Sequence, residues 1–320
     1  MKTKIDILSG FLGAGKTMLI KKLISEKLQH ENIVIIENEF GEIGIDGSIL
    51  KGSNVQVREI NAGCICCTVS SDFSKAIKEV IERFNPTRII IEPSGVGKLS
   101  DILNVCKAEE IKKLAIINMI ITVVDGLKYH TYIKNFSEFY KNQIQNANTL
   151  IISRSQKLSL YKLLEVVESL QTINTKANII TTPWDNIKAE KIIAISESKG
   201  HDTLDGINLV KKPMLAGKIR NSVNHKANEV FQTVGIETPK VFSKKSLEGF
   251  LQVMEKDSTY GTILRAKGIV ETEEKKWIQF DYVPEEFQMR ESHPEYTGRV
   301  CVIGSGLNKE AIKKLFLNSK

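Results

Sequence analysis

The stretch that most constrains this chain is GFLGAGKT, residues 10–17, which fits the pattern G-x-x-x-x-G-K-[ST] at every fixed position. It follows an apolar run at 4–10 that predicts a strand, and it precedes a helical pattern at 17–29. A glycine-rich loop in this context wraps backbone N–H groups around phosphate oxygens, and the helix N-terminus adds positive potential. The chain is therefore expected to form an α/β fold around a phosphate-binding loop, or P-loop.

The residue types within the loop predict separate roles. The Lys16 ammonium is expected to reach the β- and γ-phosphates, and the Thr17 hydroxyl to ligate Mg²⁺. The backbone around the phosphates comes from small residues, namely Gly10, Gly13, Ala14 and Gly15. The sequence thus predicts a nucleoside triphosphate bound with Mg²⁺.

Apolar runs alternate with helical patterns through the first two-thirds of the chain. Further strands are predicted at 32–38, 87–95, 116–126, 147–155 and 176–182, and further helices at 72–84, with Asp72 as its N-cap, and at 160–173. Continuous apolar strands separated by helices are typical of a parallel sheet covered on both faces. We therefore expect a P-loop NTPase fold with a mostly parallel sheet over residues 1–208.

The pattern changes after about residue 200. Residues 209–228 lack periodicity and are interpreted as a linker, and residues 229–320 as a separate small domain. Its strands are predicted at 229–238, 261–271, 276–283 and 298–306, and its helices at 244–256 and 308–319. This mixture predicts a C-terminal α+β domain with its helices on one face of a sheet.

In the segment IIIEPSG, residues 89–95, the acidic residue Glu92 directly follows the apolar residues of the predicted strand. Ligands of open α/β sheets collect at the carboxyl ends of the strands. Glu92 is therefore expected to hold Mg²⁺ through water or to orient the attacking water, and Gly95 to offer its N–H to the γ-phosphate. Together with Lys16, these two residues are the predicted catalytic residues.

Two clusters in the same half of the chain suggest a second metal. Glu37, Glu39, Glu42 and Asp46 crowd one loop, and Cys64, Cys66 and Cys67 form a C-x-C-C group. Clustered carboxylates repel one another unless a cation is near, so a metal or the Mg²⁺–nucleotide would explain the acidic loop, and a solvated acidic loop is the alternative. Thiolates bind Zn²⁺ or Co²⁺ well, and Cys64 with Cys67 also has the C-x-x-C spacing of a redox pair. We favour a metal site over a redox pair.

Composition limits the environment and the partners. Five cysteines in 320 residues, three of them clustered, do not form a secreted disulfide framework, so a reducing cytoplasm is expected. The longest apolar run, at 114–124, is shorter than a membrane helix needs, and the N-terminus is not interpreted as a signal sequence. The net charge of +7 comes from dispersed lysines, so no nucleic-acid partner is expected.

The motifs GFLGAGKT, ENEFGEIGID, CICC and EPSG, in this order and spacing, resemble the CobW-like branch of the P-loop GTPases, relatives of the hydrogenase and urease nickel-insertion GTPases. The C-terminal segments YGTILRAKGIV and RVCVIGSGLNKEAIKKL look like that family's C-terminal domain. The resemblance implies a Mg²⁺- and GTP-dependent metallochaperone with zinc or cobalt as cargo on the C-x-C-C cysteines. It further implies a client metalloprotein or cofactor-assembly enzyme as partner. The sequence is also compatible with a homodimer.

The chain departs from the family at the base-recognition motif, where N-K-x-D is replaced by Ser153, Arg154, Ser155 and Gln156. A glutamine offers one carbonyl acceptor where the aspartate accepts two hydrogen bonds from guanine, so ATP or relaxed base use is an alternative. The five histidines are scattered, and none is assigned to a metal. An ATP-dependent activator of a metal-cofactor enzyme, for example a corrinoid enzyme, that carries no metal itself is the alternative function.

Overall fold

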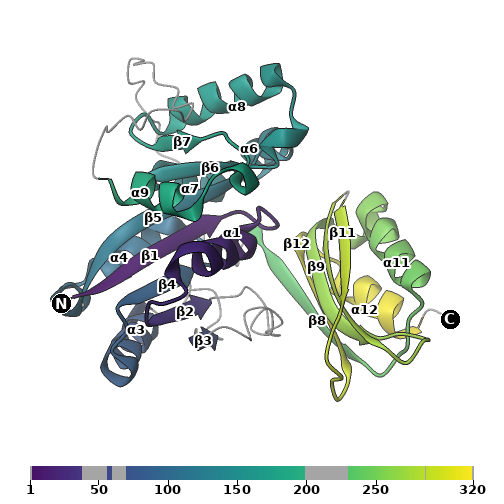
Figure 1. Cartoon of the computed structure of the whole chain (residues 1–320). Helices are drawn as coiled ribbons and strands as arrows, with labels where there is room; N and C mark the ends of the chain where they lie inside the picture. The colour runs from purple at the N-terminus through teal and green to yellow at the C-terminus, as the bar shows by residue number, and fades with distance from the viewer. Residues whose placement is uncertain (1, 38–55, 60–69, 199–229, 285, 319–320) are drawn as a thin grey trace. The chain divides into compact units, whose positions relative to one another are not determined.

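The structure, a computed structural model, describes residues 2–37, 56–59, 70–198, 230–284 and 286–318. Contacts divide these residues into two compact units, one up to residue 198 and one from residue 230 (Figure 1). The predicted linker at 209–228 lies outside the described residues.

The N-terminal unit contains a seven-stranded sheet in which every neighbouring pair of strands is parallel. The strand order is β3-β2-β4-β1-β5-β6-β7. The strands are β1 (Thr3–Gly10), β2 (Ile33–Glu37), β3 (Gln56–Glu59), β4 (Arg88–Glu92), β5 (Ala115–Asp125), β6 (Thr149–Ser153) and β7 (Asn178–Ile180). The parallel sheet predicted from the apolar runs is confirmed.

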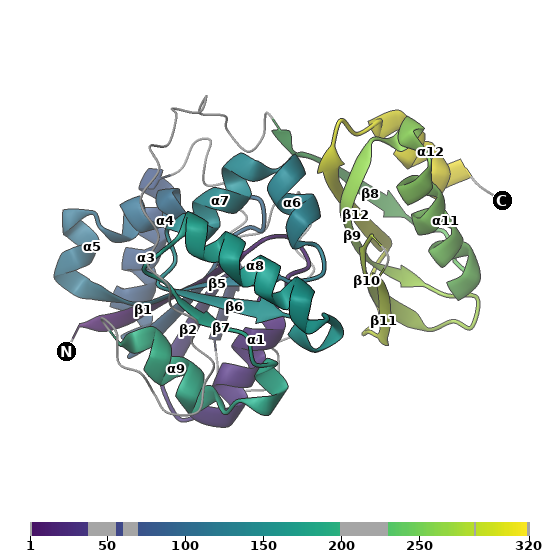
Figure 2. The same ribbon diagram turned by 90° about the horizontal axis from the view of Figure 1, so that it is seen from above.

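Helices cover both faces of this sheet (Figure 2). One face packs on α1 (Lys16–Leu23), the π-helical turn Ile24–Leu28 and α9 (Ala189–Glu197), which share one apolar core with it. The opposite face carries the other helices, among them α3 (Ser70–Phe84), α4 (Leu99–Cys106), α7 (Ser137–Gln145) and α8 (Leu160–Ile173). The shorter α5 (Glu109–Leu114) and α6 (Tyr129–Asn135) complete the α-helices described in this unit.

Several element boundaries differ from the sequence-based expectation. The strand predicted to run to residue 95 ends at Glu92 because Pro93 has no N–H for the ladder. The helix predicted to be capped by Asp72 already begins at Ser70, so the capping prediction is wrong. Sequence reasoning also missed β3 and the helices α4, α5, α6, α7 and α9, most of which are too short to repeat a 3.6-residue pattern clearly.

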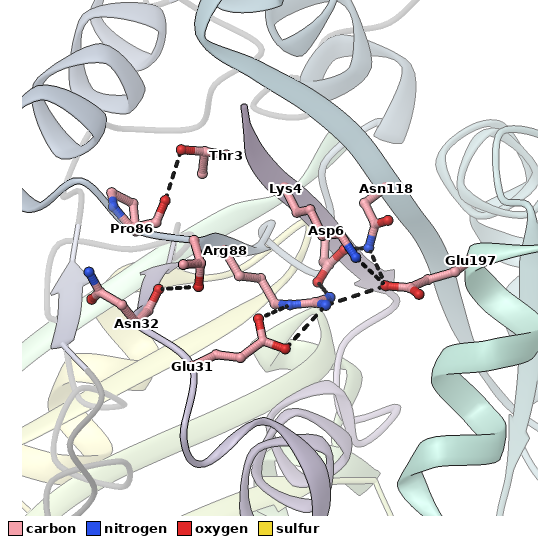
Figure 3. Close-up of polar contacts among 10 residues, drawn as sticks. Thr3, Lys4, Asp6, Glu31, Asn32, Pro86, Arg88, Asn118 and Glu197 are labelled. Carbon is pink, nitrogen blue, oxygen red and sulfur yellow. Dashed lines mark hydrogen bonds and ion pairs between the residues drawn. The ribbon is translucent and has the colours of Figure 1, made fainter. Parts of the chain in front are cut away.

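An ionic network joins the strands of the N-terminal unit away from the P-loop (Figure 3). The buried Arg88 guanidinium pairs with Asp6, with Glu31 at 2.9 Å and with Glu197 at 3.3 Å. The Asn118 amide donates to the carboxylates of Asp6, at 2.7 Å, and Glu197, at 2.8 Å. The network therefore ties β1, β4 and β5 to the last turn of α9.

The C-terminal unit is an antiparallel sheet of five strands in the order β11-β10-β9-β12-β8. Its strands are β8 (Gln232–Thr238), β9 (Thr262–Glu271), β10 (Trp277–Val283), β11 (Glu286–Glu291) and β12 (Gly298–Ser305). Helices α11 (Lys244–Lys256) and α12 (Lys309–Asn318) pack on one face of the sheet (Figure 1). The α+β class is confirmed, and only β11 was missed. No helix of the described residues is both long and apolar enough to cross a membrane.

Candidate functional site

The P-loop lies where the sequence predicts it, between the end of β1 and the start of α1. No side chain of the described residues caps α1, so the first N–H groups of this helix face the loop. Gly15 has a φ of 100°, and a Cβ there would lie 2.8 Å from the Trp184 ring. Backbone geometry and the neighbouring indole therefore both require glycine at this position.

Phe11, within the P-loop, packs its ring against a cluster of aromatic side chains. Its ring lies 4.6 Å from the ring of Tyr132, 5.4 Å from that of Phe136 and 5.6 Å from that of Tyr140, measured between centroids. These aromatic rings come from α6, α7 and the residue between them, and all are buried. The loop is thus held by packing on helices that the sequence pattern did not predict.

Lys16, Thr17 and Glu92 meet at the carboxyl edge of the sheet. The Thr17 hydroxyl lies 3.1 Å from each oxygen of the Glu92 carboxylate. The Lys16 ammonium lies 4.0 Å from the same carboxylate and donates to the Phe11 carbonyl at 3.4 Å. The side chains of Lys16 and Glu92 are 6% and 14% exposed, so both charges act in a partly desolvated site.

Glu37 adds a second buried carboxylate at this edge. It is the last residue of β2 and pairs in register with Glu92 at the end of β4. Register partners on adjacent strands point to the same face of a sheet. A hydroxyl and two carboxylates are the hard oxygen donors that Mg²⁺ prefers, so this donor set fits the cation.

The segment after Glu92 folds against the P-loop. Ser94 to Gly97 form a turn closed by the hydrogen bond from the Gly97 N–H to the Ser94 carbonyl, at 3.0 Å. A Cβ on Gly95 would lie 2.9 Å from the Leu12 backbone nitrogen. Gly95 therefore lies against the backbone of the P-loop, and no other residue has room there.

The segment predicted to recognise the base contacts the same loop through Arg154. This residue has a φ of 57°, and its guanidinium lies 3.0 Å from the Gly13 carbonyl and 2.7 Å from the Asp125 carboxylate. The Ser153 hydroxyl donates to the Val124 carbonyl at 3.4 Å, whereas Gln156 is exposed. Among the described contacts of Ser153, Arg154, Ser155 and Gln156, the one that reaches the P-loop comes from Arg154.

Asp125 is a site residue that sequence reasoning missed. It ends β5 and is buried, and this burial raises the pKa of its carboxyl although the Arg154 charge lowers it. Its position as the last, acidic residue of an apolar strand is the same signal that identified Glu92. Trp184 was also missed, because a single aromatic residue after a short strand carries no motif.

The predicted metal-cargo residues Cys64, Cys66, Cys67 and Glu42 lie outside the described residues, as do Glu39 and Asp46. Within the described part of the chain, no group of three or more His, Cys, Asp or Glu side chains is placed to hold a metal ion. Burial raises the pKa of the Cys106 thiol to about 12, so this cysteine stays protonated at neutral pH.

Two family models match the chain. The model described as the CobW/HypB/UreG nucleotide-binding domain matches residues 4–181, and the one described as the cobalamin synthesis protein CobW C-terminal domain matches residues 231–320. The first match contains the P-loop, Glu37, Glu92 and the base segment.

Individual relatives are similar over parts of the chain. The Escherichia coli zinc chaperone YeiR is 28% identical over 155 residues, which are 48% of this chain and 47% of that protein. The Sinorhizobium zinc chaperone CobW is 37% identical over 132 residues, 39% of this chain and 37% of that protein. This chain thus spans less than half the length of either. The Schizosaccharomyces pombe zinc-regulated GTPase metalloprotein activator 1 is 24% identical over 95% of this chain and 83% of its own length.

Proposed function

Because this chain belongs to the CobW/HypB/UreG family of P-loop GTPases, we propose that it couples GTP hydrolysis to the delivery of a metal ion. The observation that carries the proposal is the convergence of Lys16, Thr17 and Glu92 at the P-loop of the matched domain. Two relatives are named zinc chaperones, so zinc is the proposed cargo, and cobalt, which accepts similar ligands, is the second choice.

The phosphate chemistry follows from the charges at the P-loop. Lys16 binds the β- and γ-phosphates, and the N–H groups at the start of α1 add donors to them. Thr17, Glu92 and Glu37 would hold Mg²⁺, which neutralises phosphate charge when it is bound. Glu92 also orients the attacking water, and Gly95 donates its N–H to the γ-phosphate.

The cargo site is proposed from the sequence. The thiolates of Cys64, Cys66 and Cys67 bind the metal, and Glu42 or an acceptor protein supplies a further ligand. Nucleotide binding sets the metal affinity, and hydrolysis on a client metalloprotein or cofactor-assembly enzyme releases the ion. This coupling requires metal affinities that differ between the nucleotide states.

Calorimetric titration tests both which nucleotide the protein binds and whether it binds zinc. GDP, ADP and a non-hydrolysable GTP analogue are titrated into the wild-type protein and into Cys66→Ala, with and without Zn²⁺. We expect GDP to bind more tightly than ADP, and Zn²⁺ affinity to differ at least about tenfold between the analogue and GDP states. Cys66→Ala should lose zinc binding and keep GDP binding.

Cys106→Ala is the matched control, since the buried, protonated Cys106 thiol is not a proposed ligand and its removal should leave zinc binding unchanged. Equal zinc affinity in the two nucleotide states would refute the coupling.

A second candidate is an ATP-dependent activator of a metal-cofactor enzyme that carries no metal. The exposed Gln156 favours it, because no carboxylate in residues 153–156 can accept the hydrogen-bond pair of guanine. Preference for ADP over GDP in the same titration, with unchanged metal binding in Cys66→Ala, would support this candidate.

A further inference from the structure

Side chains of α7 contact the segment between β4 and α4 and the first turn of α4. The Glu138 carboxylate pairs with the Lys98 ammonium at 2.7 Å. One turn further along the helix, the Asn142 side chain accepts from the Ser100 N–H at 3.1 Å and donates to its hydroxyl at 3.0 Å. These contacts fix the end of the segment that leads into α4.

Gln143 holds the start of the same segment. Its side-chain NH₂ donates to the Gly95 carbonyl at 3.0 Å and to the Gly97 carbonyl at 2.9 Å, so both amide hydrogens are used on one turn. The residue is fully buried, and its own backbone carbonyl accepts from the Thr122 hydroxyl of β5 at 2.8 Å. The central sheet therefore supports the amide that grips the turn.

The amide oxygen of Gln143 is buried and accepts no hydrogen bond from the described residues. A buried acceptor left in this state is unfavourable, and a residue that served packing alone would not need it. The two hydrogen bonds that the Gln143 amide donates therefore indicate a specific role for this side chain beyond packing.

The turn of Ser94 to Gly97 is held by contacts on two sides. Gly95 lies against the Leu12 backbone on one side and is bonded to Gln143 on the other. Two N–H groups of the turn are engaged within it: that of Val96 by the Ser94 hydroxyl at 3.4 Å, and that of Gly97 by the Ser94 carbonyl. Within the described residues, the Gly95 N–H is bonded to no acceptor, which leaves it available to a ligand at the P-loop.

We propose that Gln143 is a positioning residue for hydrolysis, which aims the Gly95 N–H at the γ-phosphate by holding the Gly95 and Gly97 carbonyls. The proposal rests on the proposed function, because it requires a nucleoside triphosphate at the P-loop. A diphosphate has no γ-phosphate, so this grip contributes to triphosphate binding and turnover and not to diphosphate binding.

The test replaces Gln143 by methionine, which keeps the length of the side chain and removes both donors. Turnover kinetics give kcat and KM for GTP and ATP, and titration gives Kd for GDP and for a non-hydrolysable GTP analogue. We expect kcat to fall about 10- to 100-fold and the analogue to bind about tenfold more weakly, while Kd for GDP stays within about twofold. Gln145→Met is the matched control, because Gln145 is exposed on the same helix.

A second variant guards against a Gln143→Met protein that fails to fold. Gln143→Asn keeps the amide but is one methylene shorter, so it cannot reach both carbonyls, and the same split with a smaller loss of kcat is expected. Unchanged kcat in a folded variant, or equal weakening of GDP and analogue, would overturn the role of Gln143. A wild-type protein that binds GDP but turns over neither triphosphate would overturn both this role and the proposed hydrolysis.

Discussion

Arg154 shows how one residue can connect the base segment with the phosphate site. Its left-handed backbone directs the side chain back to the Gly13 carbonyl and to the Asp125 carboxylate. Asp125 is 1% exposed and also accepts from the N–H groups of Leu127, at 3.0 Å, and Lys128, at 3.4 Å. The arginine thus neutralises a buried carboxylate while it supports the P-loop.

Removing Arg154 should be costly for this reason. Arg154→Ala leaves the Asp125 carboxylate buried without its ion-pair partner, and we expect the free energy of unfolding of the N-terminal unit to fall by about 3–5 kcal/mol. The double variant Arg154→Ala/Asp125→Asn should recover much of this loss, because the introduced asparagine is uncharged and keeps an oxygen for the two N–H donors. Urea unfolding at neutral pH measures the free energy of unfolding of the wild type, of both single variants and of the double variant. Strictly additive losses would contradict the pairing of Arg154 with Asp125.

At the scale of elements, polar contacts at the last turn of α9 add to the apolar packing of this helix on the sheet. Glu197 accepts from the Asn118 amide at 2.8 Å and pairs with Lys4 at 3.2 Å and with Arg88 at 3.3 Å (Figure 3). Burial raises the pKa of the Glu197 carboxyl, but the hydrogen bonds from Asn118 and Lys4 and the nearby positive charges lower it below its ordinary value of 4.5.

This lowered pKa predicts a pH dependence with a definite sign. The folded state favours the ionised Glu197, so its stabilising contribution is present above pH 4.5 and is lost as the pH falls through the folded pKa. Thermal melts should show Glu197→Gln below wild type at neutral pH, with the difference shrinking in acid. Glu190→Gln is the control on the same helix, since its exposed pair with Lys27 contributes little at any pH. A difference that grows in acid would contradict the assignment.

At the scale of the whole molecule, the two units each contain one of the chain's two tryptophans. Trp184 follows β7, and its ring lies 2.8 Å from the position that a Cβ on Gly15 would take. Trp277 begins β10 of the C-terminal sheet. The two indoles therefore report separately on the P-loop and on the C-terminal unit.

Tryptophan emission should follow nucleotide binding through Trp184. Phosphates bound at the P-loop change the charge beside its indole, so Trp277→Phe should keep the change in emission when GDP is added. Trp184→Phe should lose it. A nucleotide-dependent signal that persists in Trp184→Phe and disappears in Trp277→Phe would show that this assignment of the reporter is wrong.

The sequence by itself determined the features that are local or that follow from a parallel sheet. The spacing of GFLGAGKT placed Lys16 and Thr17 at the start of a helix, and the apolar run before Glu92 placed its carboxylate at the strand end. Parallel strands end at one edge, so the meeting of Thr17 and Glu92 could be expected from the pattern. The C-terminal α+β unit followed from alternation and helical periodicity in the same way.

Only the tertiary structure decided which distant side chains support that site. Arg154 reaches Gly13 and Asp125, and Gln143 grips the Gly95 turn, across sequence separations that no local pattern encodes. A single buried glutamine in a short helix looks like any polar surface residue until the chain is folded around it. The physical reason is that its partners are backbone carbonyls, which every residue carries and which no sequence motif can mark.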